Sequence, residues 1–385
     1  MKRLVLLGGG HAHVHVLHAF ARQAVAGAEL LLVSPFARQM YSGMVPGLVA
    51  GHYRAEQCAI ALAPLAQAAG ARFVETSATA IDAANRKVTL ADGRVAEYDV
   101  LSVDTGPVMA RDSIPGAREH GLFLRPIEHF VRLFEDVLVL AEGRALDVVV
   151  IGGGLGGGEV AMAFAQRLRH VGNAASRVAL VTGGGLPLAG AGVAARFIER
   201  GQQALRRLGV TVFQDSCTEV QARQVLLASG ARLACDVPVL VLGPGAPVWL
   251  AGSGLALDER GFISTGQTLQ SLSHPEVFAA GDVATRSDMQ HAKSGVYAVR
   301  AGPPLSTNLR RYVGGGELLP HQPPVRTLNL LSCGGRRAIA SFGDTTAQGR
   351  WVWWWKDFID RRFIGRYTLP AIAPAGSVTR VAETK

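Results

Sequence analysis

The chain has 385 residues, of which 49% are hydrophobic and 18% are charged, with a formal net charge of +9. This composition provides a substantial buried core, so a disordered chain is excluded and two domains of ordinary size are expected. No segment reaches the roughly 18 consecutive apolar residues that a membrane-spanning helix needs, and the first residues lack the pattern of a signal peptide. We therefore expect a cytoplasmic protein, and no nucleic-acid partner is predicted.

The cysteines and the charge distribution add two further expectations. The four cysteines are widely spaced and form no C-x-x-C pair, so they are expected to be reduced structural thiols. Residues 310–385 hold 12 Lys or Arg against five Asp or Glu, which is a local excess of +7. An anionic surface is one partner that fits this excess, and a generally arginine-rich composition is the alternative explanation.

The N-terminus begins with a predicted strand, a glycine turn and a helix. Residues 3–7 are an apolar run of strand length, residues 8–10 are three glycines, and residues 11–20 have helical spacing of apolar side chains. Gly8 and Gly10 match the first two glycines of the G-x-G-x-x-G pattern. Glycines at these positions let the backbone approach a pyrophosphate at the start of a helix, where free N–H groups favour negative charge.

The same unit departs from that pattern at two positions. His13 stands where the third glycine is expected, and the next predicted strand, residues 29–34, ends in Ser34 where an acid usually binds ribose hydroxyls. His11, His13 and His15 alternate, but residues two positions apart on a helix do not face each other. No metal site is therefore predicted from these histidines.

A second copy of the unit follows. Residues 147–151 form a predicted strand, and Gly152, Gly154 and Gly157 match the whole glycine pattern. A helix is predicted over residues 159–168. The following predicted strand, residues 177–182, again ends without an acid, at Thr182.

The third signal is the stretch HPEVFAAGDVAT, in which a short apolar strand ends in Gly281 and Asp282. The aspartate is placed to accept hydrogen bonds from a polyol chain. A helix is predicted from Lys293 onward, with a break at Pro303 and Pro304.

Residues 350–367 are predicted to form an amphipathic helix. The spacing of its aromatic and apolar residues predicts that they share one face of the helix: Trp351, Trp354, Trp355, Phe358, Ile359 and Phe363. The opposite face carries Lys356, Asp357, Asp360 and Arg361. Such a helix is typical of a membrane-interface segment, and equally of a helix that packs on the protein body or on a second subunit of a homodimer.

Two nucleotide units followed by Gly-Asp resemble the FAD-dependent pyridine nucleotide-disulfide oxidoreductase superfamily, of the type II NADH dehydrogenase and sulfide:quinone oxidoreductase kind. The stretches GGGHAHVHVL and MYSGMVPGLVAGHY are most similar to the flavoprotein module that is fused to selenide, water dikinase in some bacteria. The resemblance implies an α/β fold with two Rossmann-like dinucleotide-binding domains. Residues 1–106 and 265–325 would form the FAD domain, residues 107–264 an inserted NAD(P)-binding domain, and residues 326–385 a C-terminal segment.

The resemblance also implies residue roles. The first unit would bind FAD through Gly8 and Gly10 at the pyrophosphate, with His11 or His13 over it, Ser34 near the adenosine ribose and Asp282 on the ribityl chain. Gly106 and Gly281 belong to the other two matching stretches. For His11 and His13, plain packing is the alternative. Asp104 replaces the alanine of the family's Ala-Thr-Gly stretch.

The second unit would bind NADH or NADPH through Gly152, Gly154 and Gly157, with Glu159 beside the nicotinamide. A helix N-terminal acid is the alternative for Glu159. Because Thr182 is neither acidic nor basic, the usual selector between NADH and NADPH is missing.

The region of residues 40–53 lacks the redox cysteine pair of disulfide reductases, so electrons are expected to pass to an external acceptor. Lys293, within AKSG, is similar to a lysine of sulfide:quinone oxidoreductases and would lie near a quinone; a solvated lysine is the alternative. The predicted function is transfer of hydride from NAD(P)H to FAD and of electrons to a quinone or similar acceptor, on the inner face of the cytoplasmic membrane. A sulfide-oxidising or selenium-compound-oxidising flavoprotein, and an FAD-binding partner of selenide, water dikinase with a lapsed nicotinamide site, are the alternatives.

Overall fold

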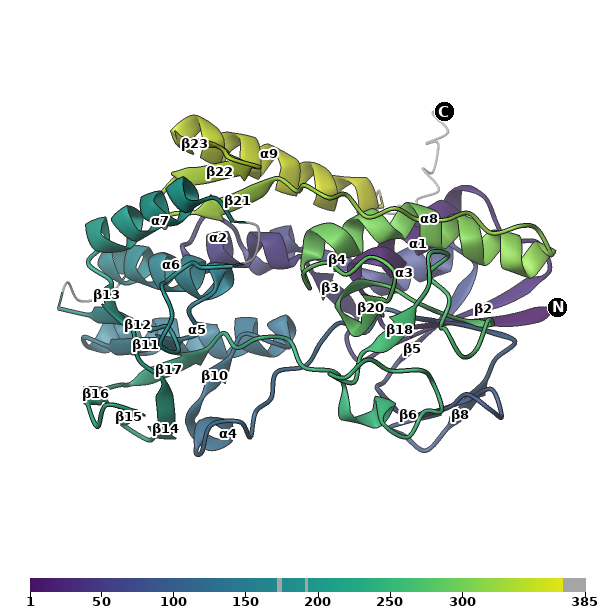
Figure 1. Ribbon diagram of the computed structural model, residues 1–385, viewed down its shortest axis with the longest axis horizontal. Coiled ribbons are helices and arrows are strands. Elements are labelled where there is room, and N and C mark those ends of the chain that lie inside the picture. Colours follow the sequence, from purple (N-terminus) through teal and green to yellow (C-terminus); the bar gives the residue numbers. More distant parts are fainter. Residues whose placement is uncertain (172–174, 191–192, 370–385) are drawn as a thin grey trace, which may run out of the picture.

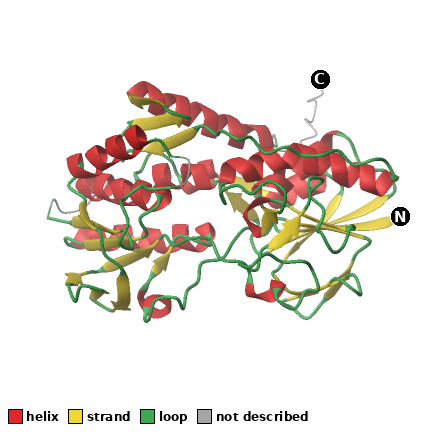
Figure 2. Ribbon diagram, viewed as in Figure 1, coloured by secondary structure: helices red, strands yellow, loops and turns green. Residues whose placement is uncertain are grey.

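The computed structural model describes residues 1–171, 175–190 and 193–369. Two five-stranded sheets lie side by side along the long axis of the molecule, each with helices packed against it (Figure 1). Figure 2 shows that loops connect the two halves and that the last long helix lies across the top of the view.

The first sheet has the strand order β19-β9-β1-β2-β5, and all of its strands are parallel. Its strands, in chain order, are β1 (Lys2–Leu7), β2 (Ala28–Ser34), β5 (Ala71–Glu75), β9 (Val100–Val103) and β19 (Val277–Ala279). Strand β9 is buried along its whole length. Its side chains belong to two hydrophobic clusters, as expected for a parallel sheet that is covered on both faces. The edge strand β19 comes from a distant part of the chain, so this half is built from two separate segments.

Helices α1 (His11–Arg22), α3 (Leu62–Ala68) and α8 (Gly295–Gly314) pack with this sheet. The prediction that the last of these breaks at Pro303 and Pro304 is wrong, because α8 continues through both prolines. Pro303 faces solvent, and the hydroxyl of Ser306 donates to its carbonyl at 2.8 Å. Close packing of Gly302 against α1 holds the inner side of the helix in place.

The second sheet has the order β10-β17-β11-β12-β13 and is also parallel. Its strands are β10 (Leu122–Phe123), β11 (Asp147–Ile151), β12 (Arg177–Val181), β13 (Thr211–Phe213) and β17 (Val237–Leu240). Its helices are α5 (Ile127–Gly143), α6 (Leu155–Val171) and α7 (Ala195–Arg207). The two predicted strand–glycine turn–helix units therefore each lie in a parallel sheet, as expected for an α/β fold with two Rossmann-like halves.

Short elements connect and extend the sheets. They are β3 (Arg38–Met40), η1 (Ser42–Met44), α2 (Val45–Val49), η2 (Ala55–Cys58), β4 (Ala59–Ala61), β6 (Ala78–Asp82), β7 (Lys87–Leu90), β8 (Val95–Glu97), α4 (Ala117–His120), β14 (Cys217–Gln221), β15 (Gln224–Leu227), β16 (Arg232–Ala234), η3 (Val248–Leu250), β18 (Ile263–Thr265), η4 (Gly281–Val283) and β20 (Ala284–Arg286).

The C-terminal part is an antiparallel sheet followed by a long helix. The sheet consists of β21 (Asn329–Ser332), β22 (Ala338–Phe342) and β23 (Thr345–Gly349), and α9 spans Arg350–Tyr367. Residues 370–385 of the predicted C-terminal segment lie outside the described residues.

Helix α9 is amphipathic, but the predicted aromatic side is wrong in part, because Phe363 is partly buried and stacks on Tyr41. Lys356 and Asp360 are only 7% and 4% exposed, whereas Trp351, Trp354 and Phe358 are each about 60% exposed. The Lys356 ammonium donates to the Asp360 carboxylate and to the Gly43 carbonyl, both at 2.6 Å. Ion pairing within the helix therefore allows the polar side to face the protein, while four aromatic side chains, Trp351, Trp354, Trp355 and Phe358, remain at the surface. We call these four residues the aromatic face.

Among the described residues, no helix has the length and apolar character needed to cross a membrane. All four cysteines are free thiols. No group of three or more His, Cys, Asp or Glu side chains is arranged to hold a metal ion in the described part of the chain.

Helix α9 offers a matched comparison of a buried and an exposed ion pair at the same spacing. Lys356→Met leaves the Asp360 carboxylate buried without its partner, so the free energy of unfolding should fall by about 3–5 kcal/mol. Arg361→Met breaks the partly exposed pair with Asp357 and should cost less than about 1 kcal/mol. Urea unfolding of both variants and the wild type measures the difference. Equal losses would show that the Lys356 pair is not desolvated.

Candidate cofactor site

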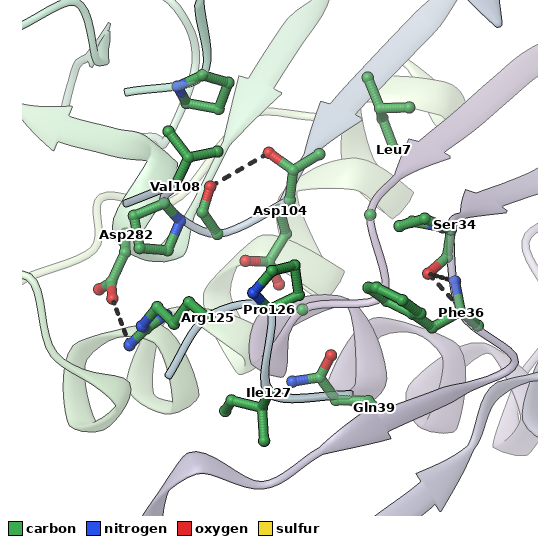
Figure 3. A pocket seen from close by; sticks show the side chains of 18 of the residues that line it. Leu7, Ser34, Phe36, Gln39, Asp104, Val108, Arg125, Pro126, Ile127 and Asp282 are labelled. Atoms are coloured by element: carbon green, nitrogen blue, oxygen red, sulfur yellow. Dashed lines mark hydrogen bonds and ion pairs between the residues drawn. The ribbon is translucent and has the colours of Figure 1, made fainter. Parts of the chain in front are cut away.

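A cavity lies at the carboxyl ends of the strands of the first sheet. Its volume is about 300 Å³, and its walls come from the β1–α1 turn, the ends of β2 and β9, the segment before α5, η4 and the start of α8. Figure 3 shows Ser34 and Phe36 toward one side of this cavity and Asp282 with Arg125 toward the other. Ligands of open α/β sheets bind at this end of the strands.

The glycine turn between β1 and α1 has no room for side chains. Gly8 has a φ of +95°, and a Cβ on Gly8 or on Gly10 would overlap Asp104. A Cβ on Gly9 would overlap the side chain of Leu62. The three glycines therefore let bare backbone form this wall of the cavity, as the sequence predicted for the first two motif positions.

Asp104 is a site residue that the sequence marked only as a departure from a family pattern. Its carboxylate accepts hydrogen bonds from the amides of Ala12 at 2.8 Å and His13 at 2.9 Å, in the first turn of α1. Burial raises the pKa of Asp104 to about 7, the two amides act in the opposite direction, and Asp282 raises the pKa further. A carboxyl group thus occupies two of the N–H groups that a bound anion would otherwise use.

The three alternating histidines point to three different places. His11 lines the cavity, its Nε2 has no hydrogen-bond partner, and burial with a smaller contribution from Arg125 lowers its pKa to about 4. His13 is fully buried outside the cavity, where its Nδ1–H donates to the Gly8 carbonyl at 2.6 Å and its Nε2 accepts from the Ser102 hydroxyl at 2.8 Å. The ring of His15 contacts the Tyr367 hydroxyl at 3.1 Å.

His13 therefore fills the position of the missing third glycine and connects α1 to the β1–α1 turn and to β9. Its neutral ring makes one donor and one acceptor contact, so a histidine satisfies this buried position completely. Only His11 of the two predicted histidines is placed to reach a cofactor.

The two ends of the cavity contain other predicted positions. The hydroxyl of Ser34 donates to the Phe36 carbonyl at 3.2 Å. At the far end, an Arg125 nitrogen lies 3.7 Å from an Asp282 oxygen; burial raises the pKa of Asp282, and Arg125 acts against this shift. Gly106 also lines the cavity. Arg125 was missed from the sequence because no motif marks it.

The second glycine turn, between β11 and α6, lies in the other half of the molecule. A Cβ on Gly152 would overlap the Val241 carbonyl, and one on Gly157 would overlap the Gly152 carbonyl, so both positions require glycine. Gly154 is exposed and nothing lies within 4 Å of a Cβ added there. The turn is therefore tightly packed on its inner side and open at its middle glycine.

Neither residue that was predicted to be catalytic lines the cavity. A Glu159 oxygen accepts a 2.6 Å hydrogen bond from the Ser332 amide, and burial raises its pKa to about 7 against the opposing effect of Lys356. The Lys293 ammonium donates to the Ala284 carbonyl and, at 2.8 Å, to the Thr285 hydroxyl.

The chemistry of the cavity fits FAD. A glycine turn without room for side chains lies at the start of α1, where a pyrophosphate binds, and Asp282 lies at the opposite end, where a carboxylate accepts hydrogen bonds from a ribityl chain. His11 adds a buried ring nitrogen with no partner in the protein. Fold and site together define a flavoprotein with two dinucleotide-binding units.

Comparison with known proteins places the chain in a family. Residues 2–302 match the pyridine nucleotide-disulphide oxidoreductase family, and the chain belongs to this family. It is an FAD-dependent oxidoreductase that uses NAD(P)H. None of the relatives named below is a selenide, water dikinase, so that part of the resemblance has no support.

Two curated relatives agree with this assignment. An NADH dehydrogenase-like protein of Mycobacterium tuberculosis is 30% identical over 328 residues, which cover 82% of this chain and 79% of the relative. The alternative NAD(P)H-ubiquinone oxidoreductase C1 of Arabidopsis thaliana is 23% identical over 332 residues, covering 74% and 62%.

Two solved structures share the fold. The sulfide:quinone oxidoreductase of Aquifex aeolicus has a TM-score of 0.80 at 17% identity, covering 95% of this chain and 91% of that one. NDH2 from Plasmodium falciparum has a TM-score of 0.78 at 12% identity, covering 95% and 97%.

Asp104 should make the stability of the protein depend on pH. Because its pKa is raised in the folded state, folding is favoured while the group is protonated, and the free energy of unfolding should fall as pH rises from about 4 to about 7. Asp104→Asn keeps an oxygen acceptor but no charge. At pH 8 it should be more stable than the wild type by an amount on the order of 4 kcal/mol, with little difference at pH 4.

Urea unfolding at pH 4, 6 and 8, with the same FAD concentration throughout, measures this effect. Asp99→Asn is the control of opposite sign, because a hydrogen bond from the Arg3 amide lowers the pKa of Asp99. A difference between Asp104→Asn and the wild type that stays constant with pH would contradict the interpretation.

Proposed function

We propose that this protein transfers hydride from NAD(P)H to FAD and passes the electrons to a quinone or another small acceptor. When bound, FAD supplies both the hydride acceptance and the electron release. The chain's own residues bind and orient the two nucleotides and admit the acceptor. The observation that carries the proposal is the packing of α9, with its exposed aromatic face, against the wall of the cavity.

The contact between α9 and the cavity wall is direct. Tyr41, between the cavity-lining residues Met40 and Ser42, stacks on Phe363 with 4.3 Å between ring centroids. The Lys356 ammonium bonds to the Gly43 carbonyl in the same segment. The inward side of α9 thus packs on the segment that forms the cavity wall, and the aromatic face lies on the outer side of the same helix.

The assignment of residues to the two nucleotides is part of this proposal. FAD would be held by the predicted residues that line the cavity, which are Gly8, Gly10, His11, Ser34, Gly106 and Asp282. Gly281 precedes Asp282 in η4, and His13 supports the turn from behind. Asp282 and Gly281 stand in η4 next to the start of α8. The corresponding division is an FAD domain of residues 1–106 and 265–325, an NAD(P) domain of residues 107–264 and a C-terminal segment from residue 326.

NAD(P)H would bind at Gly152, Gly154 and Gly157, with Glu159 beside the nicotinamide. The open space at Gly154 and the position of Glu159 in the first turns of α6 support this assignment. The predicted role of Lys293 near the acceptor rests on the sequence motif alone, because its ammonium bonds to Ala284 and Thr285.

Oxidation of a sulfur or selenium compound is the alternative reaction, and the state of Cys333 favours the dehydrogenase. Burial and the nearby Glu159 raise the pKa of the Cys333 thiol to about 12. A thiolate is the form that attacks sulfur, so this thiol is poorly suited to accept it. Cys333 also has no disulfide partner.

We further propose that the aromatic face lies on the inner surface of the cytoplasmic membrane. Large exposed aromatic side chains beside basic residues are typical of interfacial helices. Packing of the same face in a homodimer is the competing interpretation, and the vesicle experiment below separates the two.

Both nicotinamides should reduce the flavin, since Thr182 carries no charge to select between them. NADH, NADPH and then sulfide are added anaerobically while absorbance is followed near 450 nm (roughly where oxidised flavin absorbs). Either nicotinamide should bleach the flavin.

Gly154→Val should raise the half-saturating nicotinamide concentration by about tenfold, because a side chain there blocks close approach of the pyrophosphate. Its melting temperature should not change.

Gly143→Val is the control, because it also adds a side chain in open space but lies far along α5 from the glycine turn. Bleaching by sulfide alone would contradict the dehydrogenase proposal and favour the sulfur reaction. Absence of any bleaching would favour an FAD-binding partner protein.

Replacing the aromatic face with serines (W351S, W354S, W355S and F358S together) should weaken binding to phospholipid vesicles by at least about tenfold, because burial of these rings in the interface is lost. Co-sedimentation with phosphatidylglycerol and phosphatidylcholine vesicles measures the binding. The control variant carries V139S and L140S, two exposed apolar positions on α5. A change from dimer to monomer with unchanged vesicle binding would overturn the membrane proposal.

A further inference from the structure

The turn between β21 and β22 packs against α6 of the second sheet and carries two exposed arginines, Arg336 and Arg337. In this turn, residues 333–337, the Cys333 amide donates to the Arg337 carbonyl at 2.9 Å. Gly334 has a φ of +77°, and a Cβ there would lie only 2.7 Å from the Met162 carbonyl of α6. The turn can pack this closely only with glycine, and the close packing sets the position of the two arginines that follow.

A hollow of about 380 Å³ lies between this turn, α6, the end of α7 and the start of α9. Four of its lining residues are arginines from three separate parts of the chain: Arg207, Arg336, Arg337 and Arg350. The others are uncharged: Gln166, Leu208, Cys333 and Gly335. No carboxylate lines the hollow. We call it the arginine hollow.

The charge of the arginine hollow is not balanced by the protein. Across residues 1–171, 175–190 and 193–369, none of the four arginines belongs to an ion pair. The guanidinium of Arg336 instead lies 5.6 Å from the ring centroid of Trp353. Glu159 is the nearby acid, but its carboxylate is bonded to the Ser332 amide. Like charges that the fold holds together attract an anion of matching charge.

The arginine hollow is separate from the second glycine turn. Gln166, which lines the hollow, is eleven residues along α6 from its first residue, Leu155. At 1.5 Å per residue this places it roughly 16 Å from the turn. The nicotinamide nucleotide therefore does not account for the four arginines.

We propose that the arginine hollow binds a phosphate group of a soluble anion or of a phospholipid headgroup. Guanidinium groups present paired N–H donors that match phosphate oxygens, and several from different directions enclose one group. Three of the four arginines, Arg336, Arg337 and Arg350, belong to the basic stretch of residues 310–385. The site does not depend on the identity of the electron acceptor.

The test uses the FAD-loaded protein with inorganic phosphate and pyrophosphate as soluble probes, by calorimetry at low and moderate salt. The wild type should bind one anion per chain, more weakly as salt increases. R336Q combined with R337Q should weaken binding by at least about tenfold. R22Q combined with R72Q removes the same charge from exposed positions outside the hollow and should bind as the wild type does.

A second arm identifies the source of the phosphate. Both double variants are placed in the background of the serine-substituted aromatic face and tested on phosphatidylglycerol and phosphatidylcholine vesicles. Vesicle binding that is specific for phosphatidylglycerol and is lost only with R336Q and R337Q identifies the ligand as a lipid headgroup. Binding of phosphate or pyrophosphate without any vesicle binding identifies it as a free anion. If neither probe binds, or if both double variants bind equally, the proposal is overturned. Flavin bleaching by NAD(P)H is measured in parallel, so failure here is distinct from failure of the proposed function.

Discussion

The cofactor cavity depends on direct contact between the backbone of the β1–α1 turn and the end of β9. The Gly10 amide donates to the Asp104 carbonyl at 3.0 Å, and the Asp104 side chain returns to the first turn of α1. Strand β9, the glycine turn and α1 are thereby fixed relative to one another. The chain leaves this contact through residues 105–108 toward the second sheet, so the same few residues form the cavity wall and begin the connection between the halves.

The ion pair between Lys356 and Asp360 likewise fixes the position of one element, helix α9, relative to the segment that forms the cavity wall. The buried Lys356–Asp360 pair attaches α9 to the segment around Gly43, and Tyr41 packs between this helix and the cavity wall. A buried ion pair contributes little net stability when compared with an apolar replacement, but it is strongly directional. It determines which side of α9 faces the protein, and this leaves the aromatic side chains at the surface.

Most of the fold could be predicted from the sequence, because strand runs, glycine turns and their order depend on local chain geometry. Gly8, Gly10, Gly152 and Gly157 are required where backbone meets backbone, and the pattern identifies such positions directly. Placement of side chains over long sequence distances was less predictable. The carboxylate of Glu159 accepts a hydrogen bond from the amide of Ser332, which is 173 residues away in β21. No sequence motif predicts the sheet that contains this strand.

The helices α8 and α9 show why other predictions failed. A proline breaks a helix when nothing else holds it, yet α8 packs so closely on α1 that it continues through two prolines. The spacing of apolar residues on α9 correctly predicted an amphipathic helix. It did not reveal which face is buried, since a lysine and an aspartate four residues apart neutralise each other and can enter the interior together.

The order of strands in the first sheet has a consequence for how the protein is made. Val277 of β19 pairs with Leu101 of β9, whereas the second sheet takes all of its strands from residues 122–240. During synthesis the second half therefore has its complete sheet available before the first half does. Until β19 emerges, one edge of β9 has no strand beside it, and an open edge of this kind readily pairs with other chains. Because the strands of the second sheet lie in the chain between β9 and β19, the first half is the last to close, and its completion depends on synthesis of the chain beyond the second sheet.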